Sequence, residues 1–153
     1  MDYTFVELSG NPDAFFQILP VEWKNEITPI WQRYANKTQI FVLKDGDQIV
    51  AGGIVAQGMP LDMHHFFEEV REWVDKGYRY IGYLWVIENR RNRRLGSLWL
   101  EALAKHNPME NYWLTIEEEG LKQFYLRNGF RTVKKIENNG LTEWLMVKDR
   151  PGN

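Results

Sequence analysis

An apolar run from Tyr78 to Ile87, followed at once by a charged loop and an amphipathic stretch, most constrains what this chain can fold into. The run is long and apolar enough to form a central strand of a sheet. From Arg94 to about Lys105, apolar residues recur at steps of three and four, which predicts a helix with one apolar face. Such a helix must bury its apolar face, so we expect a fold that packs helices on a sheet.

The rest of the sequence predicts a mixture of strands and helices. The predicted strands are Tyr3–Leu8, Thr38–Lys44, Gln48–Val55, Tyr112–Ile116, Phe130–Ile136 and Leu141–Lys148. The predicted helices are 11–20, Glu22–Tyr34, Leu61–Lys76, Arg94–Lys105 and Glu118–Arg127. This order predicts an α/β domain with helices on both faces of the sheet.

Glycine, proline and asparagine mark the ends of these elements. Glycine adopts positive φ without a steric penalty, which predicts turns or helix ends at Gly46, Gly77, Gly129 and Gly140. Asn11 is expected to cap the first helix with its side chain. Pro29 is expected to break or kink the second helix, because proline lacks a backbone N–H.

Length and composition narrow the class of protein. The 153 residues fit one domain covering 1–153, and an apolar content of 44% is typical of a globular chain. The absence of cysteine excludes a disulfide framework, a cysteine metal site and a cysteine nucleophile, and it suits a reducing compartment. The net charge of −2 does not favour nucleic acid as a partner. Without a signal-like start or an apolar run near the ~18 residues of a membrane span, we expect a cytoplasmic protein with no membrane partner.

Four arginines lie in the loop between the predicted central strand and its helix, at positions Arg90, Arg91, Arg93 and Arg94. The first turn of a helix presents N–H groups and the positive end of the helix dipole, so it readily binds anions. Gly96 lets the backbone approach a ligand closely. The combination suits a pyrophosphate. A solvated basic patch and a nucleic-acid contact are the alternatives, although no second basic stripe with interleaved aromatic residues is evident.

The loop Arg91–Gly96, which reads Arg-Asn-Arg-Arg-Leu-Gly, is similar to motif A of the GNAT superfamily of acyl-CoA N-acyltransferases, Arg/Gln-x-x-Gly-x-Gly/Ala. Further on, Gln123–Phe130 resembles the Phe-Tyr-x-x-x-Gly-Phe ending of motif B. The two motifs stand in the family's order and usual separation, and the resemblance covers roughly Tyr80 to Val133. It implies a mixed, mostly antiparallel central sheet of about seven strands, with helices on both faces.

Two positions depart from the family pattern. Arg94 stands where the motif has its first glycine, so its side chain must point away from the phosphates or wrap around them. Glu118 stands where the family often has asparagine. The run Thr115–Glu118 fits a capping box, in which Thr115 caps a helix and Glu118 reaches back.

The resemblance implies acetyl-CoA as the co-substrate and no metal. The backbone of residues 84–87 would pair with the pantetheine arm as an added strand does, and the amides of residues 92–97 would hold the pyrophosphate. The implied cofactor-binding residues are Leu84, Trp85, Val86, Ile87, Arg91, Asn92, Arg93, Arg94, Leu95, Gly96, Ser97 and Tyr125. An acceptor amine would attack the acetyl group directly, so the rate gain would come mainly from orientation.

Three residues are candidates for catalysis. Tyr125 is the candidate acid, because the matching tyrosine of the family lies near the cofactor sulfur, and phenols can protonate a leaving thiolate. Its alternative role is to pack the last helix on the sheet. Glu88 and Glu117 are candidate bases for the acceptor amine. Alternatively, Glu88 offsets the arginines and Glu117 favours a helix N-terminus.

The acceptor is expected to be a small-molecule or peptide amine, and no spacing rule reveals its identity. The Leu61–Lys76 helix looks like an insertion relative to most family members. His64 and His65 on it either shape the acceptor pocket or lie one buried and one solvated, and its apolar stripe fits a core or a homodimer contact. A catalytically idle acetyl-CoA-binding module, acting as a sensor or interaction partner, is the alternative to an enzyme.

Overall fold

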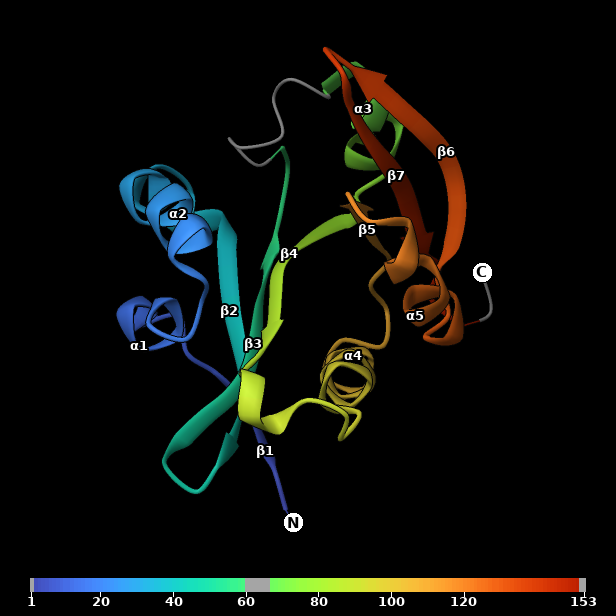
Figure 1. The fold of residues 1–153 in the computed structure, drawn as a ribbon. Coiled ribbons are helices and arrows are strands. Elements are labelled where there is room, and N and C mark those ends of the chain that lie inside the picture. Colours follow the sequence, from blue (N-terminus) through green and yellow to red (C-terminus); the bar gives the residue numbers. More distant parts are fainter. Residues whose placement is uncertain (1, 60–66, 152–153) are drawn as a thin grey trace. The chain divides into compact units, whose positions relative to one another are not determined.

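The computed structural model describes residues 2–59 and 67–151, and within them the strands form one seven-stranded sheet in the order β1-β2-β3-β4-β5-β7-β6 (Figure 1). The strands are β1 (Thr4–Glu7), β2 (Thr38–Asp45), β3 (Gln48–Ala56), β4 (Arg79–Val86), β5 (Tyr112–Ile116), β6 (Arg131–Asn138) and β7 (Leu141–Lys148). The pairs β1–β2, β2–β3, β5–β7 and β6–β7 are antiparallel, whereas β4–β5 is parallel. The expected α/β fold with a mixed, mostly antiparallel sheet is therefore confirmed.

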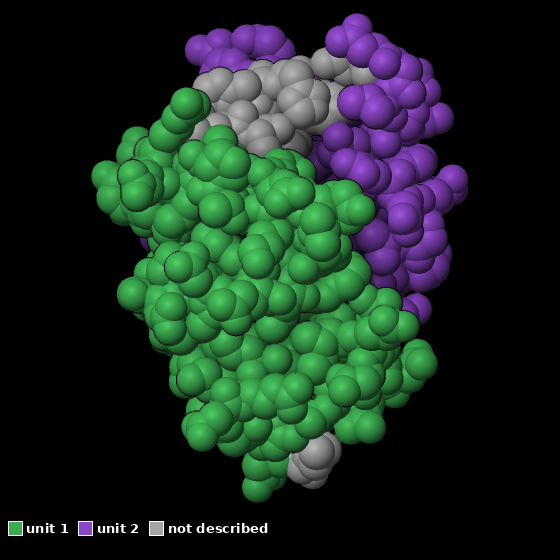
Figure 2. Space-filling view, turned by 60° about the vertical axis from the view of Figure 1, so that its left-hand side comes forward, with its two compact units in different colours: residues 1–56, 81–106 green, residues 57–80, 107–153 purple. Residues whose placement is uncertain are grey.

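The chain divides into two compact units, which Figure 2 distinguishes by colour. Unit 1 comprises Met1–Ala56 and Ile81–His106, and unit 2 comprises Gln57–Tyr80 and Asn107–Asn153. Strand β4 contributes residues to both units, since the boundary falls between Tyr80 and Ile81. Each unit is described separately below.

In unit 1, helices cover both faces of the sheet (Figure 1). A Cβ added to Gly52 of β3 would lie 2.6 Å from Phe15 of α1 (Pro12–Phe16), and one added to Gly53 would lie 2.9 Å from Trp99 of α4 (Leu95–His106). Successive residues of a strand face opposite sides, so α1 and α4 pack on opposite faces of β3. Both side chains are fully buried, and these two glycines make room for them.

Two local expectations for the N-terminal helices were wrong, namely a side-chain cap at Asn11 and a break of the helix at Pro29, whereas a kink at Pro29 stays a prediction. Asn11 makes no side-chain hydrogen bond to α1, because its backbone angles of φ −140° and ψ 68° differ from the extended conformation that directs a cap toward the helix. Helix α2 (Val21–Tyr34) continues through Pro29 as one element. Pro29 and Asn25, the residue whose carbonyl loses its N–H partner, are both exposed, so water can satisfy that carbonyl.

In unit 2, α3 (Phe67–Asp75) and α5 (Lys122–Arg127) also lie on opposite faces of the sheet. The Lys134 ammonium of β6 lies 3.0 Å from Glu69 of α3. The next residue along, Lys135, pairs with Trp144 of β7, whose ring lies 5.1 Å from the Lys122 ammonium of α5. The alternation of side chains along β6 therefore places the two helices on opposite sides.

The predicted helix Leu61–Lys76 is confirmed for the part that the structure describes. Helix α3 ends where Gly77 adopts a φ of +84°, and Tyr78 N donates to Trp73 O to close the last turn. His64 and His65 lie outside the described residues, so their predicted roles stay predictions.

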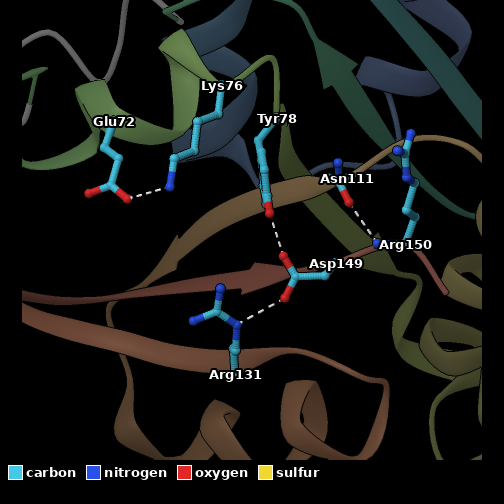
Figure 3. Close-up of polar contacts among 7 residues, drawn as sticks. All are labelled: Glu72, Lys76, Tyr78, Asn111, Arg131, Asp149 and Arg150. Atoms are coloured by element: carbon cyan, nitrogen blue, oxygen red, sulfur yellow. Dashed lines mark hydrogen bonds and ion pairs between the residues drawn. The ribbon is translucent and has the colours of Figure 1, made fainter. Parts of the chain in front are cut away.

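A polar cluster holds the end of β7 against the start of β4, β6 and the segment before β5 (Figure 3). Tyr78 Oη and Arg131 Nε both donate to Asp149, the second over 3.0 Å, and Arg150 N donates to Asn111 Oδ1 over 2.6 Å. The hydrogen bonds from Tyr78 and Arg131 lower the pKa of Asp149. The cluster therefore closes unit 2 with side chains that are far apart in the sequence.

Candidate functional site

The second half of β4 is a central strand segment that the protein leaves partly uncovered. Tyr80, Ile81 and Gly82 are buried, whereas the apolar residues 83–87 are only half-buried. Tyr83 has a φ of +55°, an uncommon value for a bulky residue and a sign that the strand is locally irregular. Of the predicted cofactor-binding residues, Leu84, Trp85, Val86 and Ile87 lie in this half-buried segment or directly after it.

The loop after β4 turns sharply before α4 begins. It starts as a short helical turn, η3 (Glu88–Arg90), and then Asn92 and Arg94 adopt φ of +67° and +60°. The first α4 bond joins Leu98 N to Arg94 O over 3.0 Å. Helix geometry consequently leaves the N–H groups of Leu95 and Gly96 without intrahelical acceptors.

The backbone conformation of Arg94 is one that favours glycine, the residue that the family pattern has at this position. The backbone there is left-handed, a conformation that costs a non-glycine residue about 1 kcal/mol. The side chain of Arg94 is exposed, as is that of Arg93. The loop therefore adopts this left-handed turn with an arginine in place of the glycine.

The run of four arginines suggested that Arg90 helps to bind an anion, but Arg90 instead forms contacts within the protein. Its guanidinium donates to Asp45 Oδ2 over 2.7 Å and to Gln48 Oε1 over 3.2 Å, and the hydrogen bond to Asp45 raises its pKa. Asp45 and Gln48 flank the β2–β3 turn. Arg90 thus ties the loop to this hairpin, and its charge is already compensated within the protein.

Arg91 lies back on the strand that precedes it. Its Nε donates to Val86 O over 3.2 Å, and its guanidinium carbon lies 4.5 Å from the centre of the Trp85 ring. Cation–π contacts of this kind are favourable. The structure therefore brings three of the predicted cofactor-binding residues, Trp85, Val86 and Arg91, into direct contact.

If the loop binds acetyl-CoA as the sequence predicts, replacing Asp45 with asparagine is expected to weaken that binding about threefold to tenfold, because the partly buried ion pair that holds Arg90 loses its charge. Calorimetric titration with acetyl-CoA measures this change. The matched control is Asp47→Asn, which removes an exposed carboxylate from the same turn and should leave the affinity unchanged. Equal affinities for the two variants would show that the loop does not depend on this pair.

Tyr125 is part of a packed aromatic group in unit 2. Its ring lies 4.9 Å from that of Phe124 and 5.3 Å from that of Phe130, and only 8% of its surface is exposed. Burial raises the pKa of Tyr125 to about 12. Gly129, with a φ of +90°, turns the chain so that Phe130 reaches the Tyr125 ring. The packing contacts are present, and the acid role stays a prediction.

The two candidate bases lie in different units. Glu88 of unit 1 begins η3, and Glu117 of unit 2 follows β5; both side chains are exposed. The capping box was wrong, because Thr115 belongs to β5 and the next helical turn, η4 (Glu119–Leu121), has Glu118 as its N-cap without a side-chain cap bond. The local cause is that β5 extends past Thr115 to Ile116.

A group of aromatic residues whose mutual contact sequence reasoning did not predict lies beside β4 in unit 1. The Trp23 ring of α2 lies 5.8 Å from the Tyr83 ring and 5.2 Å from the Trp85 ring. Tyr83 Oη donates to Glu26 Oε1 over 3.0 Å. Trp23 and Glu26 are three residues apart on a helix, and Tyr83 and Trp85 two apart on a strand, so each pair shares a face. Nothing in the sequence indicates that the two faces meet.

Within residues 2–59 and 67–151, no group of three or more His, Asp or Glu residues is placed to hold a metal ion. Over the same residues, no helix has both the length and the apolar character that crossing a membrane requires.

The sequence matches the acetyltransferase (GNAT) family over residues 10–130. Because this match spans more than half of the chain, the protein belongs to the GNAT acetyltransferase family. No protein of curated function matches the sequence.

Solved structures show the same fold at low sequence identity. Histone acetyltransferase HPA2 and related acetyltransferase from Corynebacterium glutamicum has a TM-score of 0.69 at 19% identity, covering 100% of this chain and 99% of that one. FeeM, an N-acyl amino acid synthase from uncultured soil microbes, has a TM-score of 0.71 at 15% identity, covering 99% and 92%. A GNAT family acetyltransferase from Elizabethkingia anophelis with acetyl-CoA bound has a TM-score of 0.61 at 14% identity, covering 96% and 97%.

Proposed function

We propose that this protein is an N-acetyltransferase that transfers the acetyl group of acetyl-CoA directly to the amine of an acceptor. The observation that carries the proposal is the loop of Arg91–Gly96, which joins the half-buried end of β4 to the first turn of α4. Its N–H groups without intrahelical acceptors and its exposed arginines suit an anionic pyrophosphate. The GNAT acetyltransferase bound to acetyl-CoA among the solved structures supports the choice of co-substrate.

In the proposed reaction the acceptor nitrogen attacks the thioester carbonyl carbon, the C–S bond breaks, and the amine loses a proton. The backbone of residues 84–87 orients the thioester arm, and Glu88 or Glu117 takes the amine proton. Tyr125 acts on the leaving sulfur. With a pKa of about 12, its hydroxyl stays protonated at neutral pH and works as a hydrogen-bond donor to the thiolate.

Replacing Tyr125 with phenylalanine is expected to lower kcat about 100-fold with little change in the affinity for acetyl-CoA, because only the hydroxyl is lost. Steady-state thiol release against amine concentration measures the effect. The pKa of about 12 also predicts that Tyr125 stays protonated up to pH 10, so its ionisation should cause no loss of the wild-type rate at any pH up to that value. Phe124→Leu, a change in the neighbouring ring, is the packing control. An unchanged kcat in Tyr125→Phe would leave this residue a packing role alone.

Thiol release from acetyl-CoA over a panel of amines tests the proposal itself. Acceptor-dependent release is expected. Binding of acetyl-CoA without such release would instead support an idle module that senses the cofactor, and displacement of a labelled oligonucleotide by CoA would support a nucleic-acid contact at the arginines. The cytoplasmic location and the homodimer remain parts of this proposal.

A further inference from the structure

Three aromatic residues of unit 1, Trp23, Tyr83 and Trp85, form a group that we call the aromatic cluster. The Trp23 ring contacts the other two edge-to-face, with ring centres 5.8 Å from Tyr83 and 5.2 Å from Trp85, and each side chain is half-buried. Other large aromatic residues of unit 1, such as Phe41 and Trp99, are fully buried. The cluster therefore keeps part of its ring surface accessible at the half-buried end of β4.

The cluster has the electrostatic character of a cation site. The faces of aromatic rings carry negative potential, and they bind ammonium and guanidinium groups within about 6 Å of the ring centre. The exposed Glu26 carboxylate adds a full negative charge and is held next to the cluster by the Tyr83 hydroxyl at 3.0 Å. The Arg91 guanidinium carbon lies 4.5 Å from the centre of the Trp85 ring, so one ring of the cluster already makes a cation–π contact within the protein.

The backbone of Tyr83 is a second observation that points to a functional role for the aromatic cluster. Tyr83 keeps a φ of +55°, which is costly for a tyrosine and persists only where surrounding contacts hold it. Its contacts include the ring of Trp23 and the carboxylate of Glu26, both on α2. The strained residue thus joins the charged and aromatic parts of the cluster.

We propose that the aromatic cluster and Glu26 bind a cationic group, an ammonium or guanidinium, of the acetyl acceptor. This inference rests on the proposed function, because Tyr83 and Trp85 flank Leu84, the first residue of the segment expected to orient the cofactor arm. An acceptor recognised here carries a positive charge at the cluster, and one with a carboxylate at that point is repelled by Glu26. The acceptor is therefore a basic amine rather than an acidic amino acid.

Binding of tetramethylammonium, a cation that cannot be acetylated, tests the site independently of catalysis. The protein is labelled with 5-fluorotryptophan, and the fluorine resonances are assigned with Trp23→Phe and Trp85→Phe. We expect the resonances of Trp23 and Trp85 to shift in a saturable way, while those of the fully buried Trp99 and Trp113 stay in place. Sodium chloride at equal ionic strength and the neutral isostere tert-butanol should cause no such shift. Unmoved resonances of Trp23 and Trp85, or equal shifts with tert-butanol, would overturn the proposal.

Variants of α2 test the role of the charge. Glu26→Gln is expected to raise the dissociation constant for tetramethylammonium about fivefold, because the carboxylate is neutralised. The control Glu22→Gln removes an exposed carboxylate one turn away on the same helix and should leave the constant unchanged. Equal effects in both variants would contradict a specific role for Glu26.

Acetyl transfer separates this inference from the proposed function. We expect tetramethylammonium to be a competitive inhibitor against the acceptor, whether the acceptor is 1,5-diaminopentane or a lysine peptide. The acceptor with the higher kcat/KM identifies a small-molecule or a peptide source. Acetyl transfer that tetramethylammonium does not inhibit would contradict the cation site but not the proposed acetyltransferase function. Saturable binding of tetramethylammonium without acetyl transfer to any amine would contradict the acetyltransferase function but not the cation site.

Discussion

Replacing Trp99 with alanine is expected to lower the free energy of unfolding by about 4 kcal/mol, the typical cost of deleting a fully buried aromatic side chain. Trp99 has 0% exposed surface, packs against Gly53 of β3, and its Nε1 donates to Phe41 O over 2.9 Å. The variant loses the packing and the hydrogen bond and leaves a cavity between α4 and the sheet. Urea unfolding followed by circular dichroism measures the change.

The contact between Trp99 and Gly53 can be tested separately with a double-mutant cycle. Gly53→Ala alone is expected to cost about 2 kcal/mol, because the new Cβ would lie 2.9 Å from Cζ2 of an indole that its hydrogen bond holds in place. In a Trp99→Leu background, where the indole edge is absent, the same change should cost much less. Gly10→Ala, with no atom within 4 Å of the added Cβ, is the control. Equal costs of Gly53→Ala in both backgrounds would contradict the contact.

Replacing Gly96 with glutamate is expected to weaken acetyl-CoA binding about 100-fold. The new carboxylate lies in the first turn of α4, where the pyrophosphate is expected, and two like charges about 5 Å apart repel by about 3 kcal/mol at an effective dielectric constant of about 20. Helix propensity and the helix dipole do not oppose the change, because glutamate favours a helix N-terminus more than glycine does. Titration with acetyl-CoA and thermal unfolding together measure both effects.

Two variants separate the charge from other consequences of that change. Gly96→Gln has nearly the same size without the charge, so the difference in affinity between the two variants reports the repulsion alone. Gly10→Glu adds the same charge where the added Cβ meets no other atom, and it should leave the affinity unchanged. Similar affinities of Gly96→Glu and wild type would place the pyrophosphate elsewhere.

Most secondary structure could be predicted because its signals are local. The apolar run of β4 and the three- and four-residue repeat of α4 report their own periodicity, and Gly77 and Gly129 end their helices with positive φ. The predicted helix caps at Asn11 and Thr115 were wrong because capping is not determined by local sequence alone. A cap depends on backbone angles that neighbouring elements impose, and the one-letter pattern does not contain them.

The candidate site could be predicted in position but not in its contacts. The resemblance located the loop at Arg91–Gly96, and the positive φ of Arg94 agrees with glycine at that position in the family. Counting four arginines as anion ligands was misleading, since Arg90 pairs with Asp45, which lies 45 residues earlier in the chain. No local rule connects positions so far apart.

By itself, the sequence determined the order of strands and helices, the turn that leads into α4, and membership of the GNAT family, because periodicity, glycine conformations and short motifs act over a few residues. Only the tertiary structure decided that Arg90 holds the loop to the β2–β3 hairpin, that Arg91 lies on Trp85, and that Trp23 and Glu26 meet Tyr83. Each of these contacts joins side chains whose proximity depends on how complete elements pack, and packing is a property of the folded chain as a whole.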